Sequence, residues 1–484
     1  MVSRALVAAG AIFIVIAVTG LIATNFVNNM ESKELVKGRL GIVIDAGGSG
    51  TRLSIFELRK DKGMQMIDYI ACEDNGLASY ERNPEPIKDL LVKCLLKARE
   101  NVPVETRKTV PLYMEATAGM RILRLKNQTA FDKIWDIVRN SLNQSQFKFK
   151  HAGTMTGAKE GITGWGALNY LSSGFKSTKT LGALELGSTS FQVVFQPAKK
   201  DFVGGSEIYN FDGHHYKAYV HSYLCYGRSA FEQRYLAKLV VDQNYSSTVK
   251  DPCGHQGNRF FKTSDYLWAV PCSSGPYALK TFGSELTGPS GKTYTFTGQS
   301  NFTECLSSVG KLIDTTRCNH SSCSFYGVAQ PGVHGDFAAF SAFYYPPKDL
   351  NMSKTANRSE YESAVKKICS MTASEVRTIP LPPKYRYTYC LSSAYAYKLL
   401  TQGIHFNDTT WKITFIRKVN SNSISWSLGY QLMNENEMSQ ETIHVSRLLS
   451  KTEFIGILSA CCSFAFLGIL ILFSVWCRNL RYRI

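Results

Sequence analysis

The amino-acid sequence predicts an α/β protein of two lobes with one apolar helix at each end. Three observations support this fold class. The chain has 484 residues, 44% of them hydrophobic, and this length is more than a single hydrophobic core usually organises. An apolar strand, an acidic residue and a Gly-rich turn occur together twice, at 41–55 and 183–195, which indicates an internal duplication. Uncharged runs at both ends are long enough to cross a bilayer.

The composition narrows the class of protein and of partner. Aromatic residues make up 12% of the chain and charged residues only 19%, which excludes a largely disordered protein. Lys and Arg outnumber Asp and Glu by 55 to 38, giving a net charge of +17. This balance attracts polyanions such as nucleic acid, anionic lipid or phosphorylated small molecules. Charge alone does not choose among them.

The two ends of the chain predict its topology. Residues 5–24 and 454–477 are uncharged, and each run is long enough to span a hydrocarbon core of about 30 Å. A cleaved signal peptide is the alternative for the first run, although its apolar part exceeds the usual length of about 7 to 15 residues. Arginines flank both runs on their outer sides, so the tails 1–4 and 478–484 are expected in the cytoplasm. Residues 28–450 are then extracytoplasmic.

Sequons and cysteines agree with that placement. Ten of the 13 cysteines lie within 28–450, an even number that is typical of five disulfides in an oxidising compartment. Zinc binding would call for Cys-x-x-Cys spacing, which the sequence does not contain. We therefore expect no nucleic-acid partner. Eight Asn-x-Ser/Thr sequons, the acceptors for N-linked glycans, lie in the same segment: Asn127, Asn143, Asn244, Asn301, Asn319, Asn351, Asn357 and Asn407.

The duplicated hairpins carry the residues of an anion site. Asp45 precedes the Gly-rich turn at 46–51, and Glu185 precedes a turn of Gly, Ser and Thr at 187–190. Such turns direct backbone amides and hydroxyls at a phosphate, while a carboxylate at the strand end suits a divalent cation, often held through water. Either loop alone also fits an ordinary β-turn. The pair favours a clamp for a polyphosphate and its metal.

Five segments in order resemble the apyrase-conserved regions of the ecto-nucleoside triphosphate diphosphohydrolases. They are IVIDAGGSGT (42–51), EATAGMR (115–121), TGAKEGITGW (156–165), GALELGSTS (182–190) and GDFAAFSAFYY (335–345). The terminal spans and the cysteine layout also resemble the cell-surface branch of that family. The resemblance implies two RNase H-like lobes of the actin and hexokinase superfamily around a nucleotide cleft. It also implies an enzyme that hydrolyses nucleoside tri- and diphosphates and releases orthophosphate.

The same resemblance implies how the chain is divided. We expect lobe I to comprise 37–155 and 417–450, and lobe II to comprise 156–416. The chain thus leaves the first lobe and returns to it, which brings both spans to one membrane. A homo-oligomer is expected from the family alone. The expected location is the cell membrane with the catalytic segment outside, and Golgi and lysosomal membranes stay open as alternatives.

Three residues are implied for the chemical step. Glu160 matches the general base that activates the attacking water, Thr117 lies where the family has a hydroxyl near that water, and Gln192 matches a residue that positions it. From the residues alone, a helix-capping acid is the favoured interpretation of Glu160. Thr117 fits a buried turn hydroxyl, and Gln192 fits core packing. The resemblance favours the catalytic interpretation.

The ligand contacts implied by the resemblance fall in three groups. Asp45 and Glu185 would hold Ca²⁺ or Mg²⁺ through water, with Trp426 near the metal's water shell. Tyr345 and Tyr389 would stack on the base, although core packing is the default for a lone tyrosine. The phosphate contacts would be Gly48, Ser49, Gly50, Thr51, Gly187, Ser188, Thr189 and Ser190. The implied disulfides are Cys72–Cys94, Cys272–Cys305, Cys318–Cys323 and Cys369–Cys390, which leaves Cys225 to pair with Cys253.

The second loop departs from the family pattern. Glu185 stands where the family has Asp, and Ser188 adds a side chain where a Gly is usual; Gly48 and Gly50 also differ in the first loop. A displacement of about 1 Å near reacting groups costs about a hundredfold in rate, so we expect hydrolysis to be weakened or shifted between tri- and diphosphates. One alternative is a nucleotide-binding pseudoenzyme or sensor with Glu185, Ser188 and Thr189 as its signature. Another is a glycosylated adhesion protein.

Overall fold

The computed structural model describes residues 2–29, 31–48, 50–60, 62–73, 75–175, 179–198, 206–211, 213–420, 422–438, 442–447 and 451–481. It divides into two compact units. One comprises Leu40–Ser439, and the other combines the two ends of the chain, Met1–Arg39 and Gln440–Ile484.

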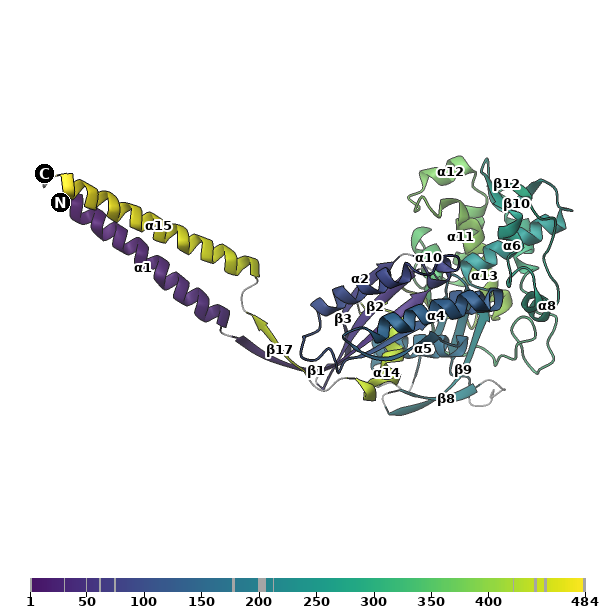
Figure 1. Ribbon diagram of the computed structural model, residues 1–484. Helices are drawn as coiled ribbons and strands as arrows, with labels where there is room; N and C mark the ends of the chain where they lie inside the picture. Colours follow the sequence, from purple (N-terminus) through teal and green to yellow (C-terminus); the bar gives the residue numbers. More distant parts are fainter. Residues whose placement is uncertain are drawn as a thin grey trace. The chain divides into compact units, whose positions relative to one another are not determined.

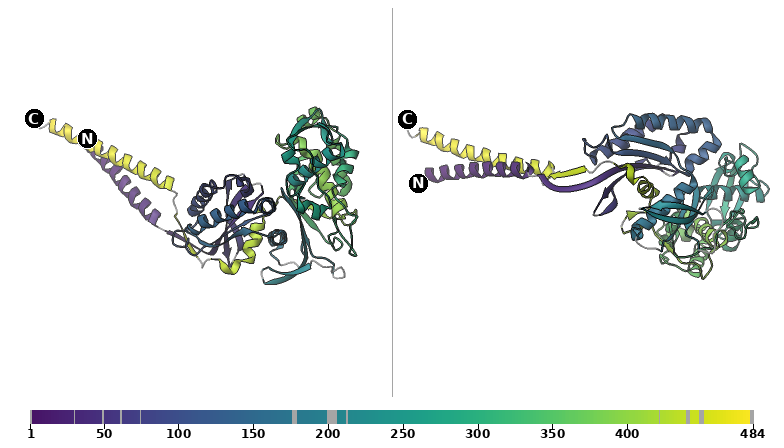
Figure 2. Two further views of the ribbon diagram at one scale, coloured as in Figure 1. Left: turned by 45° about the vertical axis from the view of Figure 1, so that its right-hand side comes forward. Right: turned by 90° about the horizontal axis from the view of Figure 1, so that it is seen from below.

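The terminal unit is built on two apolar helices, α1 (Val2–Asn29) and α15 (Lys451–Arg481), which lie side by side (Figures 1 and 2). Small residues permit this close packing, because a Cβ on Gly10 would come within 2.9 Å of the Leu472 side chain. The segments Arg4–Asn25 and Glu453–Arg478 have mean hydropathies of 2.7 and 2.5, so both helices are long and apolar enough to cross a membrane. The predicted spans lie within them.

The first sheet of the larger unit has β1 at its centre. Its strands are β1 (Glu31–Gly47), β2 (Gly50–Arg59), β3 (Gly63–Glu73), β4 (Pro111–Ala116) and β5 (Lys148–Thr154), in the order β3-β2-β1-β4-β5. β2 and β3 are antiparallel, whereas β4 is parallel to β1 and β5 is parallel to β4. The first part of β1 also pairs antiparallel with β17 (Thr442–Arg447).

The second sheet repeats this pattern. Its strands are β6 (Gly182–Leu186), β7 (Ser190–Phe195), β8 (Ser206–Phe211), β9 (His214–Leu224), β13 (Phe337–Ser341) and β14 (Ile413–Phe415), in the order β14-β13-β6-β7-β9-β8. β6, β7 and β9 are successively antiparallel, and β13 is parallel to both β6 and β14. Hence β6 corresponds to β1 and β13 to β4. The duplication predicted from the two hairpins is therefore present in the fold.

Helices cover both sheets, and two of them lie between the sheets. One face of the first sheet packs on a core shared with η1 (Leu77–Tyr80), α2 (Ile87–Glu100), α3 (Ala118–Lys126) and α4 (Gln128–Asn143). Its other face shares a core with the second sheet, α5 (Gly157–Ser173) and α14 (Trp426–Met433); Figure 1 shows α5 and α14 together. Val43 of β1, Trp165 of α5 and Phe340 of β13 are all fully or nearly fully buried there.

Glycines let α5 approach its neighbours closely. A Cβ on Gly161 would lie 3.1 Å from the Val194 side chain of β7, and one on Gly429 of α14 would overlap the Thr163 backbone of α5. The helix starts at Thr156, whose hydroxyl accepts a hydrogen bond from the Lys159 amide at 3.1 Å. This packing fixes the first turn of α5 against both sheets.

Most of the remaining elements belong to the outer part of the second lobe. The helices are α6 (Arg228–Asp242), α7 (Ser264–Leu267), α8 (Pro276–Phe282), α9 (Phe302–Gly310), α10 (Tyr345–Asp349), α11 (Arg358–Cys369), α12 (Ala373–Thr378) and α13 (Tyr389–Lys398). A third sheet of β10 (Thr248–Gln256), β11 (Arg259–Thr263) and β12 (Thr293–Gly298) lies among them. Shorter pieces of this lobe are η2 (Ala342–Tyr344), η3 (Arg386–Thr388) and η4 (Leu399–Gly403). β15 (Lys418–Val419), β16 (Asn422–Ser423) and η5 (Glu435–Glu437) lie on either side of α14 in the chain, and Val419 packs on the core between the sheets.

Five disulfides are present, and two of the predicted pairings are wrong. Cys72–Cys94, Cys318–Cys323 and Cys369–Cys390 form as expected. The structure replaces the expected Cys272–Cys305 and Cys225–Cys253 by Cys225–Cys272 and Cys253–Cys305.

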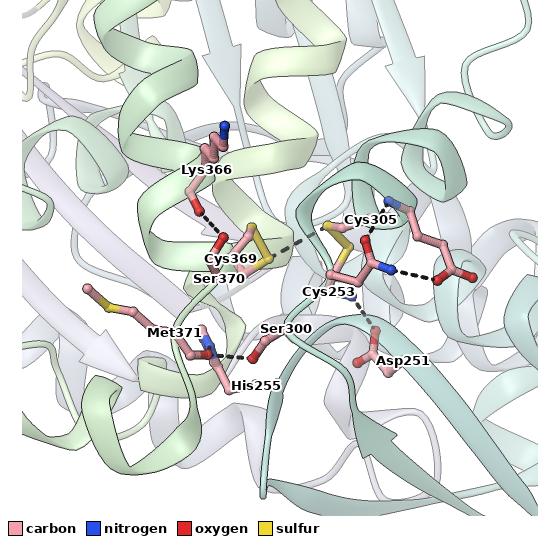
Figure 3. Close-up of a disulfide and its surroundings, with 12 residues drawn as sticks. Asp251, Cys253, His255, Ser300, Cys305, Lys366, Cys369, Ser370 and Met371 are labelled. Atoms are coloured by element: carbon pink, nitrogen blue, oxygen red, sulfur yellow. Dashed lines mark hydrogen bonds between the residues drawn. A yellow bond between two sulfur atoms is a disulfide. The ribbon is translucent and has the colours of Figure 1, made fainter.

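Packing of the outer lobe explains this exchange of partners. α9 packs on β10, which brings the Cα atoms of Cys305 and Cys253 to 4.7 Å, while Cys225 at the end of β9 meets Cys272 after α7 at 5.4 Å. Figure 3 shows the Cys253–Cys305 bridge beside Cys369, and Cys305 Sγ lies 3.6 Å from Cys390 Sγ of the same neighbouring bridge. Order along the chain carries no information on such contacts.

Candidate active site

Both hairpin loops open onto one cavity of about 520 Å³. Asp45 and Glu185 lie on its wall at the ends of β1 and β6, and Glu160 lies there in the first turn of α5. Trp426, at the start of α14, completes the wall near Asp45. Residues far apart in the sequence therefore meet at one cleft, as the duplicated fold requires.

The first loop presents backbone to the cleft. Gly47 and Gly48 line the cavity, and a Cβ on Gly48 would lie 3.1 Å from the Thr189 hydroxyl of the second loop. Gly76 and Gly119 pack closely against this loop. A Cβ on Gly76 would lie 2.6 Å from the Gly47 carbonyl oxygen, and one on Gly119 would lie 3.3 Å from Gly48 Cα. A turn of this kind leaves room for a phosphate only if its own side chains and those of its neighbours are absent.

The second loop presents hydroxyls and is tied to a helix. The Ser188 hydroxyl lies 3.1 Å from that of Ser229, and the Ser229 amide donates to the Ser188 carbonyl at 2.9 Å. The Arg228 amide donates to the Gly187 carbonyl, also at 2.9 Å. The first turn of α6 therefore fixes the shape of this loop.

An arginine binds the predicted general base. Arg121 of α3 forms an ion pair with Glu160 Oε2, and the same arginine nitrogen lies 3.3 Å from the Ser190 hydroxyl. Burial raises the pKa of Glu160, and Arg121 opposes that rise. No described residue forms a hydrogen bond with the other oxygen, Oε1. Oε1 is therefore the atom of Glu160 that remains for a water molecule.

Three acids share the cleft, and their charges repel one another. Burial raises the pKa of Asp45 to about 7; Arg52 opposes the rise and Glu160 adds to it. Burial raises the pKa of Glu185 to about 8, with further contributions from the charges of Glu160 and Asp45. Only the Ser341 hydroxyl, 3.2 Å from Glu185 Oε1, favours the ionised form of Glu185. Burial and the neighbouring charges thus favour the protonated forms of Asp45 and Glu185, and a cation bound between them would favour the ionised forms.

The donor set fits a divalent cation. Asp45 Oδ1 and Glu185 Oε2 are buried carboxylate oxygens with no hydrogen-bond partner among the described residues. Ca²⁺ and Mg²⁺ both prefer oxygen ligands and retain waters when few carboxylates are available. A cation between these acids would satisfy both oxygens and lower the repulsion.

Comparisons with known proteins identify the family of this chain. The GDA1/CD39 (nucleoside phosphatase) family matches residues 31–448. Ectonucleoside triphosphate diphosphohydrolase 1 of Rattus norvegicus is 32% identical over 455 residues, which cover 88% of this chain and 86% of the relative. The chain belongs to the GDA1/CD39 family. It is therefore an enzyme of nucleoside phosphate hydrolysis.

Other similar proteins share the fold or the length of this GDA1/CD39 enzyme. Ectonucleoside triphosphate diphosphohydrolase 2 of Gallus gallus is 33% identical over 417 residues, covering 81% of this chain and 82% of the relative. The crystal structure of nucleoside triphosphate hydrolases from Neospora caninum superimposes with a TM-score of 0.61 at 15% identity, covering 87% of this chain and 95% of that one. At that identity the likeness concerns the fold, which is the two-lobed fold predicted from the sequence.

The predicted base-stacking tyrosines both line the cleft of this family member. Tyr345 is 46% exposed at the start of α10, whereas Tyr389 is buried and donates a hydrogen bond to Asp349. Tyr385 also lines the cleft, with the Arg228 guanidinium 4.9 Å from the centre of its ring. One exposed ring and one fixed ring give the outer part of the cleft an aromatic rim.

Some predicted residues do not reach the wall of the cleft. Thr51 is fully buried, and its hydroxyl has no hydrogen-bond partner among the described residues. Gly50, at the start of β2, lies against the Glu73 carbonyl oxygen, which would be 2.8 Å from a Cβ at this position. Gln192 is 1% exposed; its amide donates to the Ser190 hydroxyl at 2.6 Å and to the Ser222 hydroxyl at 3.1 Å. It therefore acts on the cleft through Ser190. Ser49 lies outside the described residues.

The other predicted contacts line the cavity. Thr117 is buried at the start of α3, and its hydroxyl makes no capping hydrogen bond. Gly48, Gly187, Ser188, Thr189, Ser190 and Trp426 also line it.

The residues of the site that sequence reasoning did not identify include three arginines and a serine. Arg52 directly follows the segment 42–51, and its charge acts on Asp45. Arg121 is the last residue of the segment 115–121 and forms an ion pair with Glu160. Arg228 and Ser341 lie at the ends of α6 and β13. An arginine next to a motif rich in Gly and acids is the signal that could have found the first two. Ser341 lies within the recognised segment 335–345, but its contact with Glu185 depends on the pairing of β13 with β6. Arg228 lies outside the recognised segments, and only the fold brings it to the cleft.

The eight sequon asparagines fall in loops and turns or at the ends of helices. Asn143, Asn244, Asn301, Asn319, Asn351, Asn357 and Asn407 are exposed. Asn127 is half-buried at the start of α4; its side chain caps the helix, and its amide nitrogen donates to Glu81 at 3.2 Å.

Proposed function

We propose that this family member hydrolyses nucleoside tri- and diphosphates to orthophosphate in a divalent-cation-dependent reaction, with Glu160 as the general base. The observation that carries the proposal is the position of Glu160 on one cleft with both hairpin loops and with two unpartnered carboxylate oxygens. The names of the similar proteins, which are triphosphate diphosphohydrolases, support the substrate class.

The chain's own residues would divide the chemical work. The backbone of Gly47 and Gly48 and the hydroxyls of the second loop would surround the phosphates. Arg121 would hold Glu160 by Oε2, so that Oε1 takes the proton of the attacking water as the terminal phosphoryl group leaves. Gln192 would orient Ser190 in this arrangement. No covalent phosphoenzyme is needed.

Asp45 and Glu185 would hold Ca²⁺ or Mg²⁺, largely through its waters, with Trp426 alongside. The cation would neutralise charge that develops on the phosphate oxygens. The base would lie against Tyr345 and Tyr389, whose rings give affinity with little discrimination among bases.

We also propose an anchored topology. α1 and α15 would cross the same membrane, with short arginine-bearing tails in the cytoplasm and the enzyme outside the cell or in a lumen. The five disulfides of the larger unit support an oxidising compartment, and the seven exposed sequons support glycosylation. A homo-oligomer through the spans is part of the proposal by family likeness.

The test is phosphate release by membranes of cells that express the full chain. ATP, ADP and UDP are supplied with calcium or magnesium, or with chelator. Glu160→Gln keeps the shape of the side chain and removes its basicity, so release should fall about 10²- to 10⁴-fold. Glu105→Gln, an exposed acid away from the cleft, is the matched control and should retain full activity. Equal release by Glu160→Gln and the control would refute the proposed base.

A second candidate is a nucleotide sensor with weak hydrolysis. The observation that favours it is the position of the Glu185 side chain. Its Oε1 accepts a hydrogen bond from the Ser341 hydroxyl, and its Oε2 lies 3.2 Å from where a Cβ on Gly164 would be. Nucleotide binding without phosphate release above the Glu160→Gln background would favour the sensor. Chelator-sensitive release that vanishes in Glu160→Gln would exclude it.

A further inference from the structure

A second cavity of about 340 Å³ lies in the outer lobe and shares no lining residue with the cleft. Its walls come from α6, α8 and the segment 310–317 that follows α9. Tyr326 and the turn around Cys272 complete them. Neither the hydrolytic chemistry nor the membrane anchor uses this cavity.

A buried arginine without a counter-ion forms part of the wall. Arg234 is 2% exposed, and its guanidinium lies 3.5 Å from the centre of the Phe282 ring and 5.0 Å from that of Tyr226. Nε and Nη1 have no hydrogen-bond partner among the described residues, and no described carboxylate forms an ion pair with this side chain. The hydroxyls of Tyr226 and Tyr326, which are neutral, form hydrogen bonds with this side chain.

A purely structural role explains this arrangement poorly. Stacking on aromatic rings stabilises a guanidinium, but it offsets only part of the cost of removing the charge from water. Buried arginines are therefore usually paired with a carboxylate or another acceptor of negative charge. Here two neutral hydroxyls are the acceptors, no carboxylate of the described residues pairs with the guanidinium, and the side chain lines a cavity that can hold an anion.

The rest of the cavity is also positively charged. Lys311 is exposed at its edge and makes no ion pair with the described residues. Lys238 pairs with Asp242, and Arg317 pairs with Asp314 at 2.7 Å. Asp314 is the only acid among the lining residues, and Thr316 also donates to it. Arg234 and Lys311 thus remain as uncompensated cations.

We propose that this cavity binds a phosphate dianion through Arg234 and Lys311, either as free orthophosphate or as the phosphate of a nucleoside monophosphate. The guanidinium offers the planar donor pair that suits an oxyanion, and Lys311 adds a mobile ammonium group. Leu286 and Leu312 give the cavity apolar wall as well, which would accommodate a nucleoside.

The site is connected to the cleft by α6. Arg234 lies six residues after Arg228, whose amide binds the Gly187 carbonyl of the second phosphate loop. At about 1.5 Å of rise per residue, this is a separation of about 9 Å along one helix. An anion that orders Arg234 therefore acts on the element that fixes the second loop.

The test is hydrogen exchange by mass spectrometry on the detergent-solubilised full chain, with the cleft saturated by a non-hydrolysable nucleotide. The probes are orthophosphate, AMP and adenosine. We assume about 10 mM ligand and a dissociation constant of about 1 mM. Binding should then slow amide hydrogen exchange about tenfold in 272–286 and 310–317, where exchange requires the site to open. AMP acting at a lower concentration than orthophosphate would identify the nucleotide as the source, and adenosine should have no effect.

Variants separate this site from the cleft. Lys311→Glu should abolish the protection, whereas Lys292→Glu, an exposed lysine of the same lobe outside the cavity, should retain it. Arg234→Met removes the buried charge and should also abolish it. Should that variant fail to fold, Lys311→Glu still decides. Absence of protection in the wild-type chain, or equal protection in Lys311→Glu, would overturn the proposal.

Discussion

The two hairpin loops of the cleft have the same topology but are held in shape by different means. The first loop is glycine backbone pressed between Gly76, Gly119 and the opposite loop. The second carries Ser188 and Thr189 and is tied to α6 by backbone and hydroxyl hydrogen bonds. The acids that precede them differ as well, because Asp45 faces Arg52 whereas Glu185 faces a hydroxyl.

This difference shows where a duplicated site tolerates change. In the first loop, shape depends on side chains that are absent, so additions are costly. In the second loop, shape depends on hydrogen bonds from a neighbouring helix, so a side chain can be present without closing the cleft. The two acids should therefore contribute unequally to cation binding, and the two loops should respond unequally to substitution.

The largest difference is expected between the two acids. Asp45→Asn leaves Arg52 without its facing carboxylate and removes a buried oxygen that has no other partner, so cation-dependent turnover should fall about 100-fold. Glu185→Gln keeps a partner in Ser341 and should lower turnover about tenfold. Phosphate release over a calcium and a magnesium titration measures both. Equal losses would mean that the two loops hold the cation equivalently.

The next effect tests the crowding of the first loop. Gly76→Ala places a Cβ 2.6 Å from the Gly47 oxygen and 2.7 Å from the Gly48 oxygen, and both contacts are backbone that must shift. Overpacking of this kind costs about 1–3 kcal/mol, and the displaced loop should raise KM for ATP severalfold. Thermal unfolding of the solubilised chain and steady-state kinetics check this. Unchanged values for both would show that the loop adapts.

The sequence did not predict the close packing around the first loop or the arginines that act on the acids of the cleft. The two acids and most of the loop residues could be placed on one cleft because short motifs with a regular strand-turn-strand pattern carry them. Glu160 could be placed there only by the resemblance of the segment 156–165 to a conserved region of the family. Arg121 could not be assigned to Glu160, since that contact joins α3 to α5 across the fold.

The cysteine pairing failed for a similar reason. Cys225 and Cys253 are near one another in the chain, but the packing of α9 on β10 brings Cys305 to Cys253, and these two cysteines form the disulfide. Gln192 was assigned to the water by resemblance, and the structure places it one layer below, behind Ser190. Local pattern thus predicts which residues belong to the site, whereas tertiary packing decides which of them touch.

A smaller effect is expected from shortening the acid of the second loop. In Glu185→Asp the carboxylate withdraws by one methylene from Ser341 and from Gly164. Turnover should rise severalfold, or the preference between calcium and magnesium should change, because a cation held through water responds to the position of its acid. An unchanged rate and preference would remove Glu185 as the cause of any weak activity.

The smallest effect should come from Ser188→Ala. The substitution removes the hydroxyl that lies 3.1 Å from Ser229 but leaves the backbone bonds from Arg228 and Ser229 to this loop in place. A hydrogen bond of this kind contributes about 0.5–1.5 kcal/mol, so the melting temperature should fall only slightly and turnover should change less than threefold. Parallel kinetics for Ser188→Ala and Gly76→Ala decide the comparison. A larger loss in Ser188→Ala would mean that side chains, rather than the helix-bound backbone, shape the second loop.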